Sequence, residues 1–219
     1  MFTRERVPMV YSRAELMSDA AVHLTGIVAA LLAVPVLITL AAVWIGDAST
    51  VAAALVYGLC LIAMLACSAV NNMVHRPHWK DRLRRIDQSA IYLKIAGSYT
   101  PFAVLTGTHA GLFLTGVWGA ALAGAVIRLV SAARLKWASI ILYLLIGWAG
   151  ALAGGPLFAQ LTTTGFALIV IAGGIYTAGV IFFVWERLPF HNTIWHVFVL
   201  AATFVLYAAV LVEISRHAA

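Results

Sequence analysis

The chain has 219 residues, of which 63% are hydrophobic and 10% charged, and its mean hydropathy is +1.00. Average globular domains are about half apolar and a quarter charged, so this composition excludes a soluble, disordered or nucleic-acid-binding protein and indicates an integral membrane protein. The formal net charge of +6 therefore needs another explanation, which membrane orientation supplies.

Residues 1–21 come before the first apolar stretch and are predicted to be a cytoplasmic segment. They contain no apolar run followed by a small-residue cleavage site, so we expect no signal peptide. Ser12 and Glu15 have the spacing of a helix capping box, in which each side chain binds the backbone N–H of the other residue. A short interfacial helix is therefore expected in this segment.

A membrane span takes about 20 predominantly apolar residues. Seven stretches qualify, namely 22–45, 51–73, 89–106, 111–131, 137–156, 164–185 and 194–214. The third is the least apolar, because it holds Lys94 and several polar residues before Pro101. The connections are too short for an extramembrane domain. The sequence thus predicts an all-α integral membrane protein in which residues 22–219 form a single bundle of seven transmembrane helices.

Lysine and arginine are unequally shared among the connections. They lie in the N-terminal segment and in the second, fourth and sixth connections, as Arg4, Arg6, Arg13, Arg76, Lys80, Arg82, Arg84, Arg85, Arg134, Lys136 and Arg187. The first, third and fifth connections have none, and only Arg216 falls on the opposite side. The positive-inside rule then places the N-terminus in the cytoplasm and the C-terminus on the extracellular or periplasmic side.

Polar side chains gather near the cytoplasmic ends of the predicted spans. They are His23 in the first span, Ser68 and Asn72 in the second, Asp87 before the third, and Asn192 and His196 at the seventh. Residues four apart share a helix face, as Ser68 and Asn72 do, and so do Asn192 and His196. Individually they are typical of caps and interhelical hydrogen bonds. As a set they favour one polar site inside the bundle.

The segment from Asp87 to Phe102, DQSAIYLKIAGSYTPF, resembles the signature of the hemolysin III family, bacterial relatives of the progestin and adipoQ receptors and, more distantly, of the alkaline ceramidases. Other matching parts are Glu15 with His23 and Gly26, Ser68, GGIY at 173–176, GVIF at 179–182, RLPF at 187–190 and IWH at 194–196. The resemblance spans the whole chain. It implies a seven-helix, multi-pass protein of the bacterial inner membrane.

The resemblance also implies zinc bound by three histidines, with Asp87 holding a zinc-bound water. Two of those three positions are Asn72 and Asn192 here, leaving His196, and Gln88 replaces a further family histidine. Zinc prefers imidazole, thiolate and carboxylate ligands, so no cofactor is expected. The alternative is a displaced zinc on His196 and Asp87 with His75 or His191. Residues 191 and 196 point apart by about 140° around a helix, which disfavours it.

Lys94 stands where the family usually has an apolar residue. It follows Asp87 by seven residues, which returns it nearly to the same helix face, and its side chain leans toward the helix N-terminus. We therefore expect its ammonium to approach Asp87 and to supply the positive charge that zinc supplies elsewhere. The alternative is a snorkelling or lipid-facing lysine.

Three functions are compatible with these features. The first is a hemolysin III-like receptor or regulator of membrane lipid or energetic state, with a metal-free polar site of His23, Ser68, Asn72, Asp87, Lys94, Asn192 and His196. The second is a zinc-dependent lipid amidohydrolase resembling the ceramidases, with Ser68 and Asp87 as catalytic candidates. The third is an ion or proton conductor or a pore-forming cytolysin. No Ser-His-Asp or Cys-His set is evident, so the first, non-enzymatic function is favoured, with the bilayer and a lipid ligand as partners.

Overall fold

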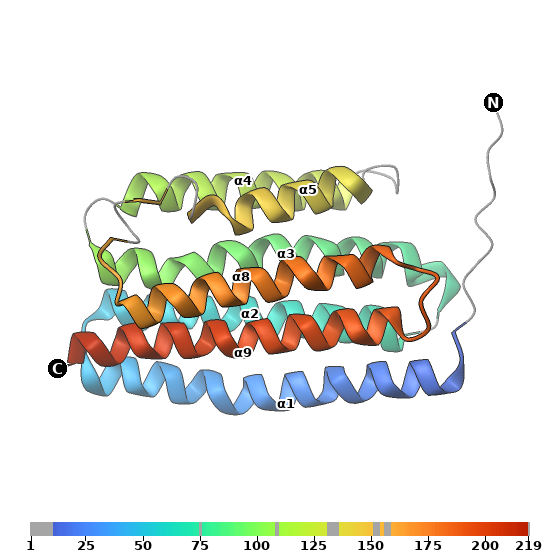
Figure 1. Cartoon of the computed structure of the whole chain (residues 1–219), viewed down its shortest axis with the longest axis horizontal. Coiled ribbons are helices and arrows are strands. Elements are labelled where there is room, and N and C mark those ends of the chain that lie inside the picture. Colours follow the sequence, from blue (N-terminus) through green and yellow to red (C-terminus); the bar gives the residue numbers. More distant parts are fainter. Residues whose placement is uncertain are drawn as a thin grey trace.

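The computed structural model describes residues 11–74, 76–107, 110–130, 136–150, 154–155 and 159–218. Its helices are α1 (Arg13–Trp44), α2 (Ala48–Met73), α3 (Pro77–Thr106), α4 (Ala110–Val130), α5 (Lys136–Gly147), α8 (Thr163–Val184) and α9 (His191–Ala218). These helices all run along the long axis of the molecule (Figure 1). The predicted all-α bundle is confirmed.

Within the described residues, five helices are long and apolar enough to cross a membrane: α1, α2, residues 111–130 of α4, α8 and α9. The apolar part of α5 is shorter and ends at Gly147, and the remainder of the predicted fifth span lies partly outside the described residues. α3 has 30 residues, but it is not apolar enough to join this group, because its first half is charged and its second half carries Lys94 and several polar residues. The chain is therefore a multi-pass membrane protein, and the count of seven crossings stays a prediction.

α1 begins well before the predicted first span. The Ser12 hydroxyl accepts a hydrogen bond from the backbone N–H of Glu15, and the Glu15 carboxylate accepts one from the backbone N–H of Ser12 over 2.8 Å. The capping box is confirmed. No proline or glycine lies between Glu15 and the predicted first span, and α1 runs from Arg13 to Trp44 with Pro35 inside it, so residues 13–21 form its first turns and not a separate interfacial helix.

α3 is the least apolar helix, yet it lies between two hydrophobic cores. Ala90 and Phe102 join residues of α1, α2 and α9 in one core. Tyr92, Ala96 and Tyr99 join residues of α4 and α5 in the other. Protein thus covers much of α3, and its polar residues are shielded from lipid, which explains why a low hydropathy is tolerated here.

α1 and α2 approach each other closely at Gly58. A Cβ atom on this glycine would lie 2.2 Å from Cγ1 of Val34, far inside van der Waals contact. Small residues allow such approaches between membrane helices, where packing takes over much of the role of the hydrophobic effect. This contact fixes α1 against α2, the two helices that carry His23 and Ser68.

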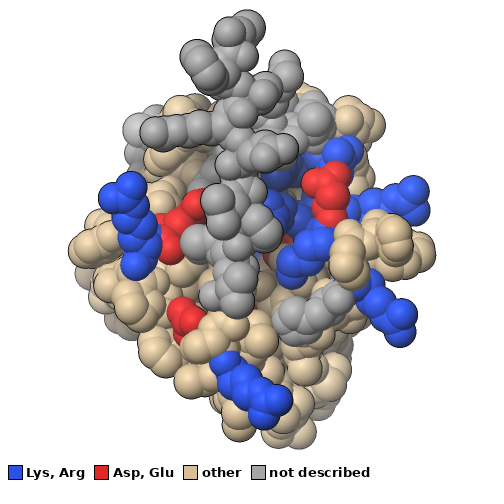
Figure 2. Space-filling view, turned by 90° about the vertical axis from the view of Figure 1, so that its right-hand side faces the viewer, with Lys and Arg blue, Asp and Glu red and all other residues tan. Residues whose placement is uncertain are grey.

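The start of the first helix and the end of the last helix lie at opposite ends of the bundle. α1 begins at one end, and α9 finishes at the other (Figure 1). Lysine and arginine side chains gather around the end where α1 begins, with a few acidic side chains among them (Figure 2). We call this end the basic end. It is the end that the charges of the connections predict to be cytoplasmic.

Candidate functional site

A polar cluster lies inside the bundle near its basic end. It is formed by Asp19 and His23 of α1, Ser68, Asn71 and Asn72 of α2, Asp87 of α3, and Asn192 and His196 of α9. A spacing of four residues places two of these side chains on one face of α1, of α2 and of α9. Asp19, His23, Ser68 and His196 are each at most 9% exposed.

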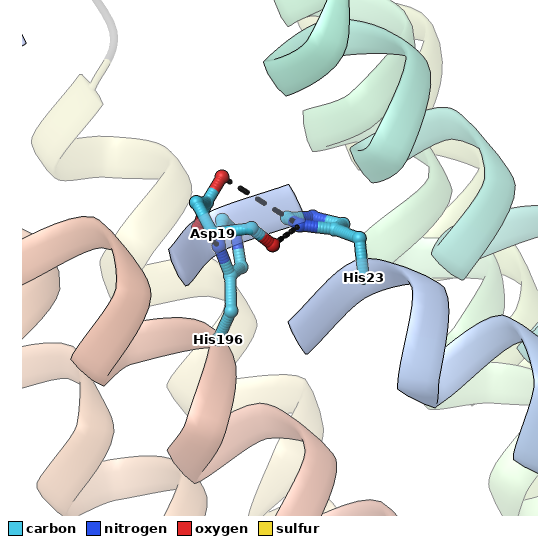
Figure 3. A group of neighbouring side chains, drawn as sticks. All are labelled: Asp19, His23 and His196. Carbon is cyan, nitrogen blue, oxygen red and sulfur yellow. Dashed lines mark hydrogen bonds and ion pairs between the residues drawn. The ribbon is translucent and has the colours of Figure 1, made fainter. Parts of the chain in front are cut away.

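Asp19 holds both histidines of the cluster. Nδ1 of His196 lies 2.6 Å from the Asp19 carboxylate. Nδ1 of His23 lies 2.8 Å from the backbone carbonyl of Asp19 and 3.6 Å from its carboxylate. The two rings meet edge to face, with centroids 4.3 Å apart. Figure 3 shows these side chains turned toward one another from α1 and α9. Two imidazoles are therefore fixed in orientation by one residue.

Ser68 closes a ring of hydrogen bonds with these three residues. Its Oγ lies 3.1 Å from Nε2 of His23 and 3.5 Å from Nε2 of His196. Ser68, His196 and Asp19 are far apart in the sequence. The helices α2, α9 and α1 bring them together, so that His196 contacts Ser68 through Nε2 and Asp19 through Nδ1. The fold creates a Ser-His-Asp arrangement that the sequence analysis missed.

The two asparagines contact each other directly. Nδ2 of Asn192 donates to Oδ1 of Asn72 over 3.1 Å and to the Asp19 carboxylate over 3.4 Å. Nδ2 of Asn72 donates to the backbone carbonyl of Ser68 over 2.9 Å. The amide groups at positions 72 and 192 therefore satisfy one another and their neighbours.

Asp87 lies on the α3 side of the cluster. Its carboxylate accepts a hydrogen bond from Nδ2 of Asn71 over 2.9 Å, and it also interacts with Ser68 and His196. Lys80 donates to the backbone carbonyl of Asn71 over 2.6 Å. Burial lowers the pKa of the Lys80 ammonium, and the nearby Arg84 guanidinium lowers it further. The Lys80 side chain also interacts with the Asp87 carboxylate, on the side of the cluster that faces the basic end.

Six of the seven predicted site residues meet in this cluster, and Lys94 does not. The expected approach of Lys94 to Asp87 is not observed. Its ammonium instead donates to the hydroxyl of Tyr176 on α8 and lies 4.2 Å from the centre of that ring. The Tyr176 hydroxyl in turn lies 2.7 Å from Oγ1 of Thr203. α8 supplies a polar partner at the depth of Lys94, which the periodicity of α3 alone does not reveal.

The form of the displaced metal set that uses His191 is not assembled among the described residues. His191 packs against Tyr11, with ring centroids 6.0 Å apart and Nε2 3.4 Å from the tyrosine hydroxyl. His75 lies outside the described residues. Asp19 was not among the predicted site residues, although its spacing of four from His23 places both on one face of α1. Asn71 and Lys80 were not predicted either, because their partners lie on another helix or on the backbone.

The zinc site that the family resemblance implies does not fit the residues present. The side chains of Asn72 and Asn192 are uncharged and hydrogen-bonded to each other. Zinc sites in proteins are built from imidazole, thiolate or carboxylate ligands and not from such amides. Among the described residues, Asp19, His23 and His196 form a group whose ligand-type atoms lie within 4.8 Å of one another. In that group the Nδ1 atoms face oxygens of Asp19, and the Nε2 atoms face Ser68.

A small cavity opens beside the ring of hydrogen bonds. Its lining comes from the apolar residues Val22, Met64, Leu65, Val199 and Leu200, and from His23, Ser68 and His196, whose polar atoms contribute no surface to it. These residues belong to α1, α2 and α9. The cavity is therefore apolar and holds no more than about one water-sized group, directly beside the hydrogen-bonded ring.

Comparisons with known proteins agree with the resemblance noted in the sequence. A family model described as "Haemolysin-III related" matches residues 14–207. "Hemolysin-3" of Bacillus cereus is 37% identical over 188 residues, which cover 84% of this chain and 86% of the relative. "Hemolysin-3 homolog" of Bacillus subtilis is 35% identical over 199 residues, covering 90% and 93%. "Monocyte to macrophage differentiation factor" of Homo sapiens is 31% identical over 166 residues, covering 71% and 67%.

Proposed function

The chain belongs to the haemolysin-III related family, and from that premise we propose that it is a membrane receptor or regulator whose polar cluster responds to a lipid ligand without a bound metal. The observation that carries this proposal is the hydrogen bond from Asn192 to Asn72. It joins α9 to α2 directly, at the two positions where the resemblance implies zinc-binding histidines.

The arrangement of the cluster supports a regulatory role. Its hydrogen bonds cross between α1, α2, α3 and α9, so they help to hold four helices in register. Buried polar networks specify one packing arrangement when they are satisfied. A ligand that replaces one of these bonds changes the balance between packing arrangements, and this is how ligand binding shifts a protein's conformation.

The apolar cavity supports a lipid as the ligand. Its lining by Met64, Leu65 and Leu200 is apolar, which suits the end of a hydrocarbon chain, and its small size means that the surrounding helices must separate to admit one. We place the cavity near the cytoplasmic face of a bacterial inner membrane, with all seven helices crossing the bilayer. The basic end of the bundle supports that orientation, because positive residues concentrate on the cytoplasmic side and attract anionic lipid.

Photocrosslinking tests the proposal. The purified chain is placed in phosphatidylcholine nanodiscs with a photoreactive fatty acid, and the crosslinked residues are mapped by mass spectrometry. We expect crosslinks at Met64, Leu65 and Val199 that persist in EDTA and are lost in Leu65→Trp, which fills the cavity. Leu122→Trp on exposed α4 is the matched control and should leave them unchanged. Crosslinks spread equally over lipid-facing helices would contradict a specific lipid site.

A second candidate function is a metal-dependent lipid amidohydrolase. The grouping of Asp19, His23 and His196 favours it, because carboxylate and imidazole are zinc ligands. Amide hydrolysis by the purified protein that stops on chelation and returns with zinc would support this function over the receptor. A pore-forming role, which the name of the Bacillus cereus relative suggests for that protein, predicts release of a trapped dye from vesicles.

A further inference from the structure

We propose that the ammonium of Lys94 and the hydroxyls of Tyr57, Tyr176 and Thr203 bind a small monovalent anion, chloride, inside the bundle. Lys94 is on α3, Tyr57 on α2, Tyr176 on α8 and Thr203 on α9, so four helices contribute to this site. None of these residues belongs to the polar cluster near the basic end. The inference goes beyond the lipid function proposed above and does not depend on it.

The Lys94 ammonium is a buried cation that makes no ion pair. Lys94 is 5% exposed, and its Nζ donates to the Tyr176 hydroxyl and lies 4.2 Å from the centre of that ring. The ion pairs found in the described part of the chain all involve other residues. The face of an aromatic ring attracts a cation but carries no net charge. Charged side chains inside membrane proteins are normally paired, so Lys94 calls for a negative partner.

Tyr57 gives a second, independent indication. It is 1% exposed, and its hydroxyl has no hydrogen-bond partner among the residues that the structure describes. It interacts electrostatically with Tyr176, the same residue that binds Lys94. Buried tyrosine hydroxyls usually find a partner, and a buried donor that lacks one lowers stability. An orphaned donor next to a buried cation indicates a site for an acceptor.

The pair formed by Tyr176 and Thr203 adds one more donor. Their hydroxyl oxygens lie 2.7 Å apart, so one of the two hydroxyl hydrogens lies between them. The other hydrogen has no acceptor within the described ranges. A helical threonine can donate to the carbonyl four residues before it, as Thr100 does to Ala96 over 3.2 Å, but Thr203 makes no such bond there.

The donors in this group outnumber the acceptors. An ammonium has three hydrogens, and one of those on Lys94 is used by Tyr176. The two that remain, the Tyr57 hydrogen and the extra hydrogen of the Tyr176–Thr203 pair make four without an acceptor in the described structure. A water molecule would add two more hydrogens and no charge. An anion only accepts, and it also neutralises Lys94.

The depth of the group favours a small ion over a lipid headgroup. Thr203 lies twelve residues after the first residue of α9, about 18 Å along a helix of about 42 Å. Tyr57 lies nine residues after the first residue of α2, about 14 Å along about 39 Å. Both are far from the helix ends, where headgroups lie. Tyr57 also belongs to the main hydrophobic core with Leu61 and Leu206, whose close packing favours a one-atom ion over a polyatomic one.

Direct binding of chloride is the first test. The purified full chain is placed in phosphatidylcholine nanodiscs in sodium gluconate, and radioactive chloride is titrated in a scintillation proximity assay against empty nanodiscs. We expect saturable binding that is lost in Lys94→Met and weakened roughly 10-fold in Tyr57→Phe, which removes one donor. Tyr99→Phe is the matched control, because the Tyr99 hydroxyl already donates to the carbonyl of Gly147 over 2.5 Å, and it should leave the affinity unchanged.

Thermal unfolding gives a second readout that separates binding from a structural role. An anion that binds only the folded protein stabilises it, so replacing gluconate by chloride should raise the Tm of the wild type and leave that of Lys94→Met unchanged. Tyr57→Phe should be at least as stable as the wild type in gluconate, since its hydroxyl has no partner in the described structure, and less stable than the wild type in chloride. A purely structural role of Tyr57 would lower the Tm equally in both salts.

The outcomes that overturn the inference concern the wild type and one pair of variants. Wild-type protein that binds no more chloride than empty nanodiscs overturns it, as does binding that Lys94→Met leaves unchanged. If Lys94→Met does not fold, equal affinities in Tyr57→Phe and Tyr99→Phe overturn it instead. The lipid function fails separately, because Leu65→Trp should remove the fatty-acid crosslinks and leave chloride binding as it is in the wild type.

Discussion

Asn192 donates its side-chain amide to Oδ1 of Asn72, and this 3.1 Å hydrogen bond joins α9 to α2 inside the polar cluster. In the hemolysin III resemblance both positions imply histidine ligands of zinc. A carboxamide oxygen carries no charge and is a weak partner for zinc. The hydrogen bond between the two asparagines links the two helices directly at these positions.

Metal analysis tests whether these positions bind zinc. Because Asn72 and Asn192 cannot act as imidazole ligands, the purified protein should hold less than about one-tenth equivalent of tightly bound zinc. The double variant Asn72→His, Asn192→His should take up zinc and lose it again when His196→Ala is added. Stoichiometric zinc in the unaltered protein that survives mild chelation would contradict this prediction and favour the metal-dependent hydrolase.

Much of the cluster could be predicted because helix periodicity relates residues on one helix. Ser68 with Asn72, and Asn192 with His196, were placed on common faces by their spacing, and the structure brings them together. Asp19 was not predicted because its role depends on His196 of α9, which is 177 positions away in the chain. Spacing along one helix says which residues share a face, and it does not identify the helix that covers that face.

Lys94 illustrates the same limit. Periodicity correctly places it inside the bundle, where it is 5% exposed, but its partner is Tyr176 on α8 and not Asp87 on its own helix. The fold was more predictable, because membrane spans are determined by length and hydropathy. The exception is α3, whose polar residues are tolerated since neighbouring helices cover it on two sides.

A double-mutant cycle tests the contact between Lys94 and Tyr176. Lys94→Leu and Tyr176→Phe should each lower the free energy of unfolding in detergent, and their combination should cost less than the sum. Hydrogen bonds to charged groups contribute about 1.5–3 kcal/mol, so we expect a coupling of about 1 kcal/mol or more. Lys94→Leu combined with Asp87→Asn is the comparison and should be additive, because the two side chains have different partners. Strong coupling there would restore the expectation drawn from the sequence.

Close packing of α1 on α2 makes Gly58 sensitive to a single methyl group. Gly58→Ala places a Cβ 2.2 Å from Cγ1 of Val34, so the free energy of unfolding should fall by about 1–3 kcal/mol. Adding Val34→Ala removes the clashing atoms and should recover part of that loss. Gly116→Ala on α4 meets no atom within 4 Å and is the matched control, for which we expect little change. A Gly58→Ala protein as stable as the wild type would show that the two helices can separate at no cost.

The orientation in the membrane yields the last prediction. A reporter fused after Ala219 should be extracellular or periplasmic, and one inserted between Arg76 and Arg85 should be cytoplasmic. Two observations support this: positive residues concentrate on one set of connections, and α1 begins at the opposite end of the bundle from the end of α9. If all seven described helices cross the bilayer, that arrangement requires the termini to be on opposite sides. A further reporter between Gly46 and Ser49 is the control and should read as extracellular or periplasmic. A cytoplasmic reporter after Ala219 would mean an even number of crossings, and α3, the most polar helix, would then be the first candidate for one that does not cross.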